Sequence, residues 1–220
     1  MRTFEDNGIK WINISKYESG RNPLFRQYIN IIDTWSNNEP IKKYIYDGKV
    51  GHELESLFKL FNTNIHFATI DDQLVAVMLT SSHQPLTHFE ELKEYIKSGR
   101  HSEDITSDIS EEFLTKQETN VIIDSKDENN LYIEYLVVNP DLHGKGIGTR
   151  IFKSIKENPV FFNNNYTDVS FIQTAIHNEN IPSRKTVIKN GFKRIKPHKD
   201  PLPYSVYYFQ LQNQTHSKEK

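Results

Sequence analysis

The stretch from Tyr132 to Ile151 constrains the fold of this chain more than any other part of its sequence. An apolar segment, Leu131–Val138, is followed by a turn that contains proline, a glycine-rich loop and an amphipathic segment, Gly146–Glu157. The loop carries three closely spaced glycines: Gly144, Gly146 and Gly148. Glycines let the backbone approach a ligand, and the free N–H groups of a first helical turn point toward it with the helix dipole behind them. The sequence therefore predicts a strand, a loop and a helix that together bind an anion the size of a pyrophosphate.

Two well-known phosphate loops do not fit these residues. A Walker A loop requires Lys and then Ser or Thr after its last glycine, whereas Gly148 is followed by Thr149 and Arg150. A dinucleotide fingerprint requires Gly-x-Gly-x-x-Gly, whereas this loop is Gly-x-Gly-x-Gly. Asp168 lies at the spacing of a ribose-binding carboxylate, but it opens the next predicted strand instead of ending one.

The hydrophobic periodicity of the rest of the chain predicts a mixed α/β fold. The predicted helices are Pro23–Trp35, Glu53–Phe61, Gly146–Glu157 and Ile181–Asn190. The predicted strands are Ile65–Ile70, Leu74–Thr80, Leu131–Val138, Asp168–Ile176, Phe192–Ile195 and Tyr204–Leu211, and an alternating stretch, Ile9–Ile14, precedes them. Strand–helix–strand–helix units imply a partly parallel sheet with helices packed against it.

The helix after the glycine loop has one apolar face. Its isoleucines recur every fourth residue, at Ile147, Ile151 and Ile155. We expect this face to pack on the sheet and to leave three cations free to reach solvent and phosphate. These cations are Lys145, Arg150 and Lys153.

The middle of the chain differs from the rest in composition. Between His88 and Asn130 there are 12 acidic and five basic residues, and few of the segment's apolar residues could form an independent core. We therefore expect an acidic insertion over 82–130, with a helix near Phe89–Lys97 and a short strand, Val121–Asp124. It is expected to interrupt a single domain over 1–212, which a disordered tail, 213–220, follows. The insertion is either a solvated loop or an acidic surface, with Glu111 among its carboxylates, that attracts a cationic substrate.

Composition excludes several functional classes. The chain has 27 Lys and Arg against 29 Asp and Glu, so we expect no binding to nucleic acid through a basic surface. The absence of cysteine rules out disulfides, thiolate metal sites and a cysteine nucleophile. The histidines lack a close ligand spacing, so no metal is expected. Neither a signal peptide nor an apolar run of membrane-spanning length occurs, which predicts a cytoplasmic protein with no membrane partner.

Two motifs resemble those of the GCN5-related N-acetyltransferases, the GNAT superfamily. Residues 143–148 are similar to its pyrophosphate loop, Arg or Gln, two residues, Gly, one residue, Gly or Ala, except that His143 stands at the first position. The segment from Asn180 to Phe192 resembles the family's second motif, which is an Asn, a helix and then Gly-Phe. The motif spacing is somewhat like that of the ribosomal-protein N-acetyltransferase branch. The resemblance implies a mixed, twisted sheet flanked by helices, with the acidic insertion lying before the cofactor-binding strand.

The resemblance also implies acetyl-CoA as cosubstrate, and no metal. The strand that ends at Val138 would hydrogen-bond the pantetheine arm as an added strand does. The residues that the resemblance places at acetyl-CoA are Leu136, Val137, Val138, His143, Gly144, Lys145, Gly146, Ile147, Gly148, Thr149, Asn180 and Ser183. Asn180 and Ser183 are equally suited to starting a helix.

Direct attack of an amine on the thioester is the reaction that the resemblance implies. Glu134 is the candidate base, since strand alternation places it on the side of Leu136 and Val138; its other interpretation is a solvated or ion-paired strand residue. The backbone N–H of Val138 is a candidate donor to the oxyanion. The family's tyrosine acid falls at Val187, so the candidates for the acid are Ser183, Tyr204 and Tyr207.

The acceptor is left open among a protein N-terminus, a lysine and a small amine. A second copy of the chain, in a homodimer, is a further candidate partner. Two rival functions remain: a non-catalytic acyl-CoA-binding module, favoured by His143 and Val187, and a protein-interaction domain that uses the acidic insertion.

Overall fold

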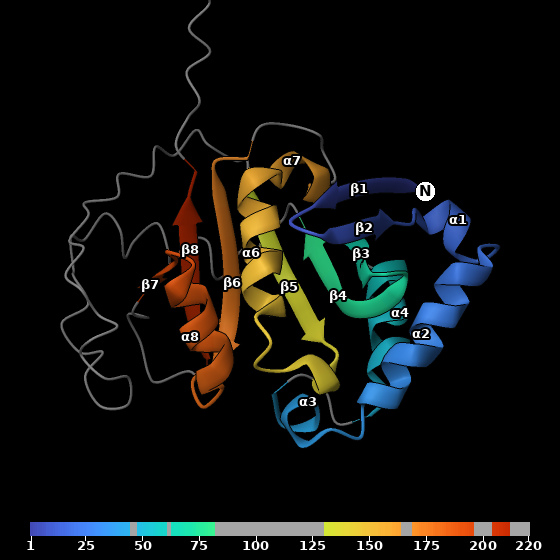
Figure 1. The fold of residues 1–220 in the computed structure, drawn as a ribbon, viewed down its shortest axis with the longest axis horizontal. Coiled ribbons are helices and arrows are strands. Elements are labelled where there is room, and N and C mark those ends of the chain that lie inside the picture. The colour runs from blue at the N-terminus through green and yellow to red at the C-terminus, as the bar shows by residue number, and fades with distance from the viewer. Residues whose placement is uncertain (45–47, 61–62, 82–129, 164–168, 196–203, 212–220) are drawn as a thin grey trace, which may run out of the picture.

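The structure, a computed structural model, describes residues 1–44, 48–60, 63–81, 130–163, 169–195 and 204–211 (Figure 1). The predicted acidic insertion lies outside these residues except for Asn130, and so do the helix and strand predicted within it, Asp168 and the predicted tail.

One sheet organises the described residues. It has eight strands in the order β1-β2-β3-β4-β5-β6-β8-β7. Their bounds are β1 Arg2–Asp6, β2 Ile9–Asn13, β3 Thr63–Ile70, β4 Gln73–Ser81, β5 Asn130–Val138, β6 Phe171–His177, β7 Lys193–Ile195 and β8 Tyr204–Gln210. Neighbouring strands are antiparallel except β5 and β6, which run parallel. The prediction of a mixed sheet is confirmed.

Helices lie on both faces of the sheet (Figure 1). Their bounds are α1 Lys16–Ser19, α2 Pro23–Trp35, α3 Glu39–Tyr44, α4 Val50–Leu60, the short 3₁₀ helix η2 Pro140–Leu142, α6 Ile147–Glu157, α7 Pro159–Phe162 and α8 Ile181–Lys189. The helix predicted over Pro23–Trp35 is confirmed at both ends, because Asn22 caps it and Pro23 starts it. Periodicity did not reveal β1, α1, α3 or α7, which are short.

Two hydrophobic clusters fill the space between the sheet and its helices. The α6/α8 cluster contains the predicted apolar face of α6, with Ile151 and Ile155 fully buried. The α2/α4 cluster contains residues of both these helices and of β2, β3, β4 and β5, and none of β6 or β8. The two clusters define which face of the sheet each strand residue occupies.

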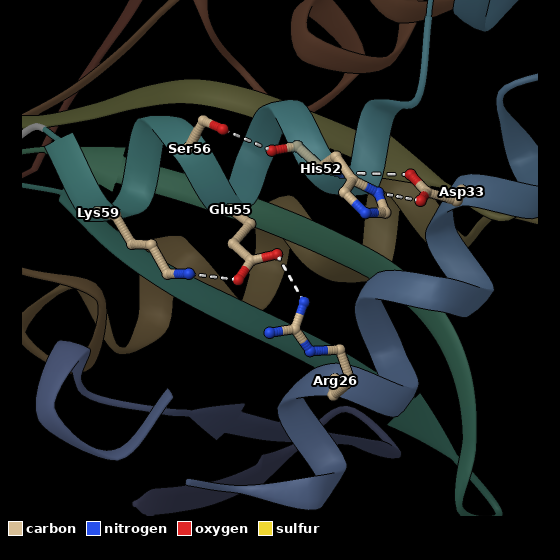
Figure 2. Close-up of polar contacts among 6 residues, drawn as sticks. All are labelled: Arg26, Asp33, His52, Glu55, Ser56 and Lys59. Carbon is tan, nitrogen blue, oxygen red and sulfur yellow. Dashed lines mark hydrogen bonds and ion pairs between the residues drawn. The ribbon is translucent and has the colours of Figure 1, made fainter. Parts of the chain in front are cut away.

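Helices α2 and α4 pack closely because Gly51 lies where they meet. A Cβ atom on Gly51 would lie 2.3 Å from the carbonyl oxygen of Ile29. Polar contacts lie on the outer side of this pair (Figure 2). Arg26 of α2 (3.2 Å) and Lys59 of α4 (2.5 Å) both bond the buried carboxylate of Glu55 on α4.

A second set of contacts joins the same two helices. The ring of His52 bonds the carboxylate of Asp33, which also accepts a 3.2 Å hydrogen bond from the backbone N–H of His52 (Figure 2). Within α4, the hydroxyl of Ser56 donates to the His52 carbonyl oxygen (3.0 Å). Helices α2 and α4, joined in this way, form the helical layer on the face of the sheet opposite α6 and α8.

Candidate active site

The glycine loop leads from β5 into α6 through η2. Asn139 opens it: its side chain accepts from the backbone N–H of Asp141 (3.0 Å), and its own N–H donates to the Val75 carbonyl oxygen (2.9 Å). Gly144 and Gly146 have φ of 76° and 80°, which side chains other than glycine's rarely adopt. A Cβ atom at either would meet nothing within 4 Å, so the space over the loop is open.

The N-terminus of α6 offers backbone donors to that open space. Gly146 is the N-cap, and no side chain caps the helix. The N–H groups of the first turn, at Ile147, Gly148 and Thr149, therefore lack the intrahelical partner that later residues have. Gly148 itself lies against α8, where its Cβ would be 3.2 Å from the Thr186 methyl. This arrangement favours binding of an anion.

Not all of the predicted loop side chains face the anion site. Nε2 of exposed His143 donates to the Val138 carbonyl oxygen (3.1 Å), so the ring is turned back on the end of β5. Lys145 is exposed beside the loop. Arg150 was expected to reach phosphate, and that expectation is wrong: its guanidinium bonds the carbonyl oxygens of Asn7 (2.8 and 3.0 Å) and Gly8 (2.9 Å) in the β1–β2 turn.

Strands β5 and β6 part beside this loop. Their parallel pairing runs from Asn130–Phe171 to Ile133–Thr174 and goes no further. Residues 135–138 of β5 keep their antiparallel partners on β4. The other edge of β5 thus presents backbone groups over 134–138 to the gap, as the edge of a sheet does to an added strand.

A β-bulge on β5 lies at the point of separation. Thr80 pairs with Ile133 and Leu79 with Tyr135, so Glu134 is the extra residue. Its carboxylate accepts a 2.6 Å hydrogen bond from the Ser81 hydroxyl. Burial raises the pKa of Glu134, and the bond from Ser81 counteracts part of the rise. A half-buried carboxylate with a raised pKa is suited to general base catalysis.

The bulge also corrects which face Glu134 occupies. Leu136 and Val138 pack on the α6/α8 cluster, whereas Tyr135 and Val137 pack on the α2/α4 cluster. Ser81, the partner of Glu134, is two residues beyond Leu79 of the α2/α4 cluster. The expectation that Glu134 shares a side with Leu136 and Val138 is therefore wrong, because simple alternation fails at a bulge.

Tyr135 lies beside Glu134 and is a further candidate for the site that the sequence did not reveal. It is half-buried on the α2/α4 face, directly after Glu134. Burial, followed by the negative charges of Glu53 and Glu134, raises the pKa of Tyr135. The residue was unmarked in the sequence because alternation placed Glu134 on the opposite face of the strand from it. Its hydroxyl is protonated at neutral pH and can donate.

The second motif forms α8 and its connection to β6. Asn180 caps the helix by accepting from the backbone N–H of Ser183 (3.3 Å), and Ser183 lies half-buried in the first turn. Val187 is fully buried in the α6/α8 cluster. The motif thus brings Asn180 and Ser183 together, while the position of the family's tyrosine points into the core.

The two tyrosines of β8 differ in what the structure describes. Tyr207 is fully buried, and its hydroxyl accepts from Nε of Arg184 (3.0 Å), whose guanidinium also bonds the Asn178 carbonyl oxygen (2.6 Å). Tyr204 pairs with His177 at the start of β8. Its side chain lies outside what the structure describes.

Helix α3 connects the N-terminal half of the chain to the end of β6. The Tyr44 hydroxyl donates to the Glu179 carbonyl oxygen (3.1 Å), and Lys43 bonds the Glu179 carboxylate (2.7 Å). The Tyr44 ring lies 5.4 Å from that of His177. These contacts link α3 to the end of β6, the strand that diverges from β5.

Two kinds of feature are absent from the described residues. No group of three or more His, Asp or Glu side chains in this part of the chain is placed to hold a metal ion. None of the helices that the structure describes has the length and apolarity needed to cross a membrane.

Comparison with known proteins gives a match to a family model over part of the chain and a similar fold. The model of the acetyltransferase (GNAT) family matches residues 108–192. The structure is similar to that of AAC(6')-Ib with acetyl-CoA and paromomycin (TM-score 0.55, 15% identity, 96% of this chain and 99% of that one). It is also similar to the GNAT domain of PAT from S. lividans (TM-score 0.53, 10% identity, 92% and 90%). A putative phosphinothricin N-acetyltransferase gives a TM-score of 0.51 at 9% identity, over 93% and 99% of the two chains.

Identities this low establish the fold alone. No protein of curated function matches the sequence. The likeness to the ribosomal-protein branch stays a prediction. Residues 108–192 thus match the model of the GNAT acetyltransferase family, and the fold along the chain is similar to that of solved GNAT acetyltransferases.

Proposed function

We propose that this protein transfers an acetyl group from acetyl-CoA to a primary amine. The observation that carries the proposal is the parting of β5 from β6 directly beside the open loop of α6, with Glu134 at the fork. The pantetheine arm of acetyl-CoA is extended like a strand, with the pyrophosphate at one end and the thioester at the other. It therefore matches the order of an anion-binding loop, a free strand edge and a carboxylate.

The residues present fit acetyl-CoA. The backbone of residues 136–138 would bind the pantetheine arm, and the N–H groups of Ile147, Gly148 and Thr149 at the start of α6 would bind the pyrophosphate. Lys145 adds a positive charge at the loop. His143, Asn180 and Ser183 complete the proposed cofactor side, with His143 requiring only rotation of an exposed ring to leave the Val138 carbonyl oxygen.

Glu134 is proposed as the base. It takes a proton from the acceptor ammonium, directly or through a water molecule, and the free amine attacks the thioester carbonyl carbon. The C–N bond forms, the C–S bond breaks, and the departing thiolate takes a proton to leave as free CoA. The Val138 N–H is proposed as donor to the developing oxyanion, and Ser183 and Tyr204 stay candidates for the acid.

A small-molecule amine is the first acceptor class to test. Solved structures of the aminoglycoside acetyltransferase AAC(6')-Ib contain paromomycin, kanamycin or ribostamycin. In this chain the negative charges of Glu53 and Glu134 both raise the pKa of Tyr135, so both carboxylates lie near its hydroxyl. Negative charge on this face favours a cationic acceptor.

Binding is tested by thermal unfolding with acetyl-CoA, free CoA, ATP and NAD in parallel. A ligand that binds only the folded state stabilises it by about 2.7 kcal/mol at 100 times its dissociation constant. Stabilisation by both CoA species but not by NAD is expected. Lys145→Glu should weaken acetyl-CoA about tenfold because it places an anion beside the pyrophosphate; Lys49→Glu, at an exposed position before α4, is the matched control.

Turnover is tested by amine-dependent release of the CoA thiol. Glu134→Gln should lower kcat about 10²–10⁴-fold with acetyl-CoA affinity retained. Glu5→Gln, at an exposed position on β1, should leave both unchanged. Full turnover by Glu134→Gln would remove Glu134 from the mechanism.

A non-catalytic acyl-CoA-binding module is the second candidate. The burial of Val187, where the family has its tyrosine acid, favours it. That function predicts stabilisation by acetyl-CoA and no amine-dependent release of CoA from any acceptor.

A further inference from the structure

A row of side chains crosses the sheet on the face opposite α6 and α8. Ser81 of β4 pairs with Tyr132 of β5, Tyr132 with Gln173 of β6, and Gln173 with Tyr208 of β8. Paired residues of a sheet lie on the same face. The neighbours Ile172 and Thr174 pair with Leu131 and Ile133, which belong to the α6/α8 cluster, so the row, here called the Gln173 row, lies on the other face.

Gln173 is fully buried and its amide is unpaired. Neither its Oε1 nor its Nε2 has a hydrogen-bond partner among the described residues. Oδ1 of buried Asn130, on the same face of the neighbouring strand, also lacks a partner in this part of the chain. A buried amide without partners costs about 1–3 kcal/mol, so such groups are rare and require an explanation.

The other buried amide on the described strands of the sheet, that of Asn13, is satisfied. Asn13 of β2 is 5% exposed, and its Nδ2 donates to the Ile65 carbonyl oxygen and to Nδ1 of His66, both at 3.3 Å. The unpaired amides are therefore not a general feature of the sheet. Gln173 and Asn130 lie where β5 and β6 are about to separate, whereas the other buried polar side-chain atoms without a partner among the described residues, Nε1 of Trp11 on β2 and Oδ1 of Asn38 after α2, lie elsewhere.

The Gln173 row adjoins the proposed reaction site. Its first member, Ser81, donates to Glu134, and the last pair of β5 and β6, Ile133–Thr174, follows directly after Tyr132–Gln173. Gln173 thus lies at the closed end of the fork, on the face that Glu134 occupies. Adjacent strands are about 4.8 Å apart, so one strand separates Gln173 from the partner of Glu134.

We propose that the amide of Gln173, with Asn130, binds hydroxyl groups of the acceptor amine. The unpaired atoms are one donor group and two acceptor oxygens, and neighbouring hydroxyls, which each donate and accept, satisfy both kinds. The aromatic rings of Tyr132 and Tyr208, on either side of Gln173, suit the apolar face of a hydroxylated ring. The acceptor class is therefore a hydroxylated cyclic amine. The inference rests on the proposed acetyl transfer.

The first test measures stability and does not depend on activity. Gln173→Met keeps the length of the side chain and removes both unpaired groups, so Tm should rise by about 2–4 °C. Asn13→Leu removes a satisfied amide and should lower Tm. A fall in Tm for Gln173→Met would overturn the proposal, because it would mean that the amide has a partner within the protein, including the residues outside the described ranges.

The second test measures the acceptor. Glucosamine and cyclohexylamine are ring amines with and without hydroxyls. Glucosamine should be the better substrate, and Gln173→Met should lower its kcat/KM about 10–100-fold, with the cyclohexylamine value and the acetyl-CoA dissociation constant unchanged. Equal loss for both amines, or no preference in the original protein, would overturn the role of Gln173.

The two proposals fail in distinguishable ways. If no amine releases CoA, the proposed acetyl transfer fails, and stabilisation of the protein by glucosamine in the presence of CoA becomes the readout. Stabilisation that Gln173→Met abolishes would support hydroxyl binding without catalysis. Equal stabilisation of both proteins, or of neither, would overturn it.

Discussion

The hydroxyl of Ser81 donates a 2.6 Å hydrogen bond to the carboxylate of Glu134 at the bulge between β4 and β5. Two opposing effects act on this carboxylate. Burial raises the pKa of Glu134, whereas the hydrogen bond stabilises its ionised form and lowers the pKa. Ser81 is thus placed to set the pH at which the proposed base becomes active.

Ser81→Ala should move the acidic limb of the pH profile upward. Without the hydroxyl, burial acts on Glu134 with less opposition, so its pKa rises further. The base must be ionised to accept a proton, and the pH at which kcat/KM reaches half its maximum should therefore rise. Ser56→Ala, on the outer side of α4, is the control. An unchanged limb would show that another group titrates there.

The local features of the site could be predicted from sequence. The glycine loop, the start of α6 and the Asn180 cap of α8 depend on neighbours a few residues apart, and each lies where the pattern placed it. The bulge depends on the register of β4 against β5, two strands that are distant in sequence. For that reason the sequence identified Glu134 but gave it the wrong face and did not reveal Tyr135.

Long-range contacts account for the remaining differences. The periodicity of α6 places Arg150 off the apolar face, where a cation is expected to be exposed. Nothing near Arg150 in the sequence indicates that it bonds the backbone of Asn7 and Gly8. The same holds for Gln173, whose significance depends on the absence of a partner among the described residues rather than on any motif.

Arg150→Ala should lower stability without weakening acetyl-CoA. The change removes three hydrogen bonds that join α6 to the β1–β2 turn, and a loss of about 1–3 kcal/mol in the free energy of unfolding is expected. Urea denaturation measures this loss. Titration with acetyl-CoA below the unfolding transition should give an unchanged dissociation constant. Weaker binding by tenfold would instead restore Arg150 as a phosphate ligand.

Stability should fall on mild acidification because of His66. This ring is fully buried, with Nε2 2.9 Å from the Thr80 hydroxyl oxygen. Burial, and secondarily the charge of Arg2, lowers the pKa of His66 from 6.5 to about 3. Below pH 6.5 the unfolded chain binds a proton that the folded protein excludes, so stability decreases as pH falls, down to about pH 3.

The measurement is the free energy of unfolding in urea at pH 7, 6 and 5. A single such histidine contributes a decrease that approaches about 1.4 kcal/mol per pH unit below pH 6. In His66→Asn this contribution should be absent, whatever the stability of the variant at pH 7. An equal slope in both proteins would show that His66 is not the group responsible.

Tyr207→Phe should separate a structural hydroxyl from a catalytic one. The Tyr207 hydroxyl accepts from Arg184, and both side chains are buried, so its removal leaves a charged donor with one bond fewer. A loss of about 1–3 kcal/mol in the free energy of unfolding is expected. Turnover should change less than twofold, since the hydroxyl bonds Arg184 within the interior and is not available to protonate a departing thiolate. If turnover instead fell by two orders of magnitude or more while stability matched that of the original protein, the assignment would be reversed, and Tyr207, rather than Ser183 or Tyr204, would be the acid.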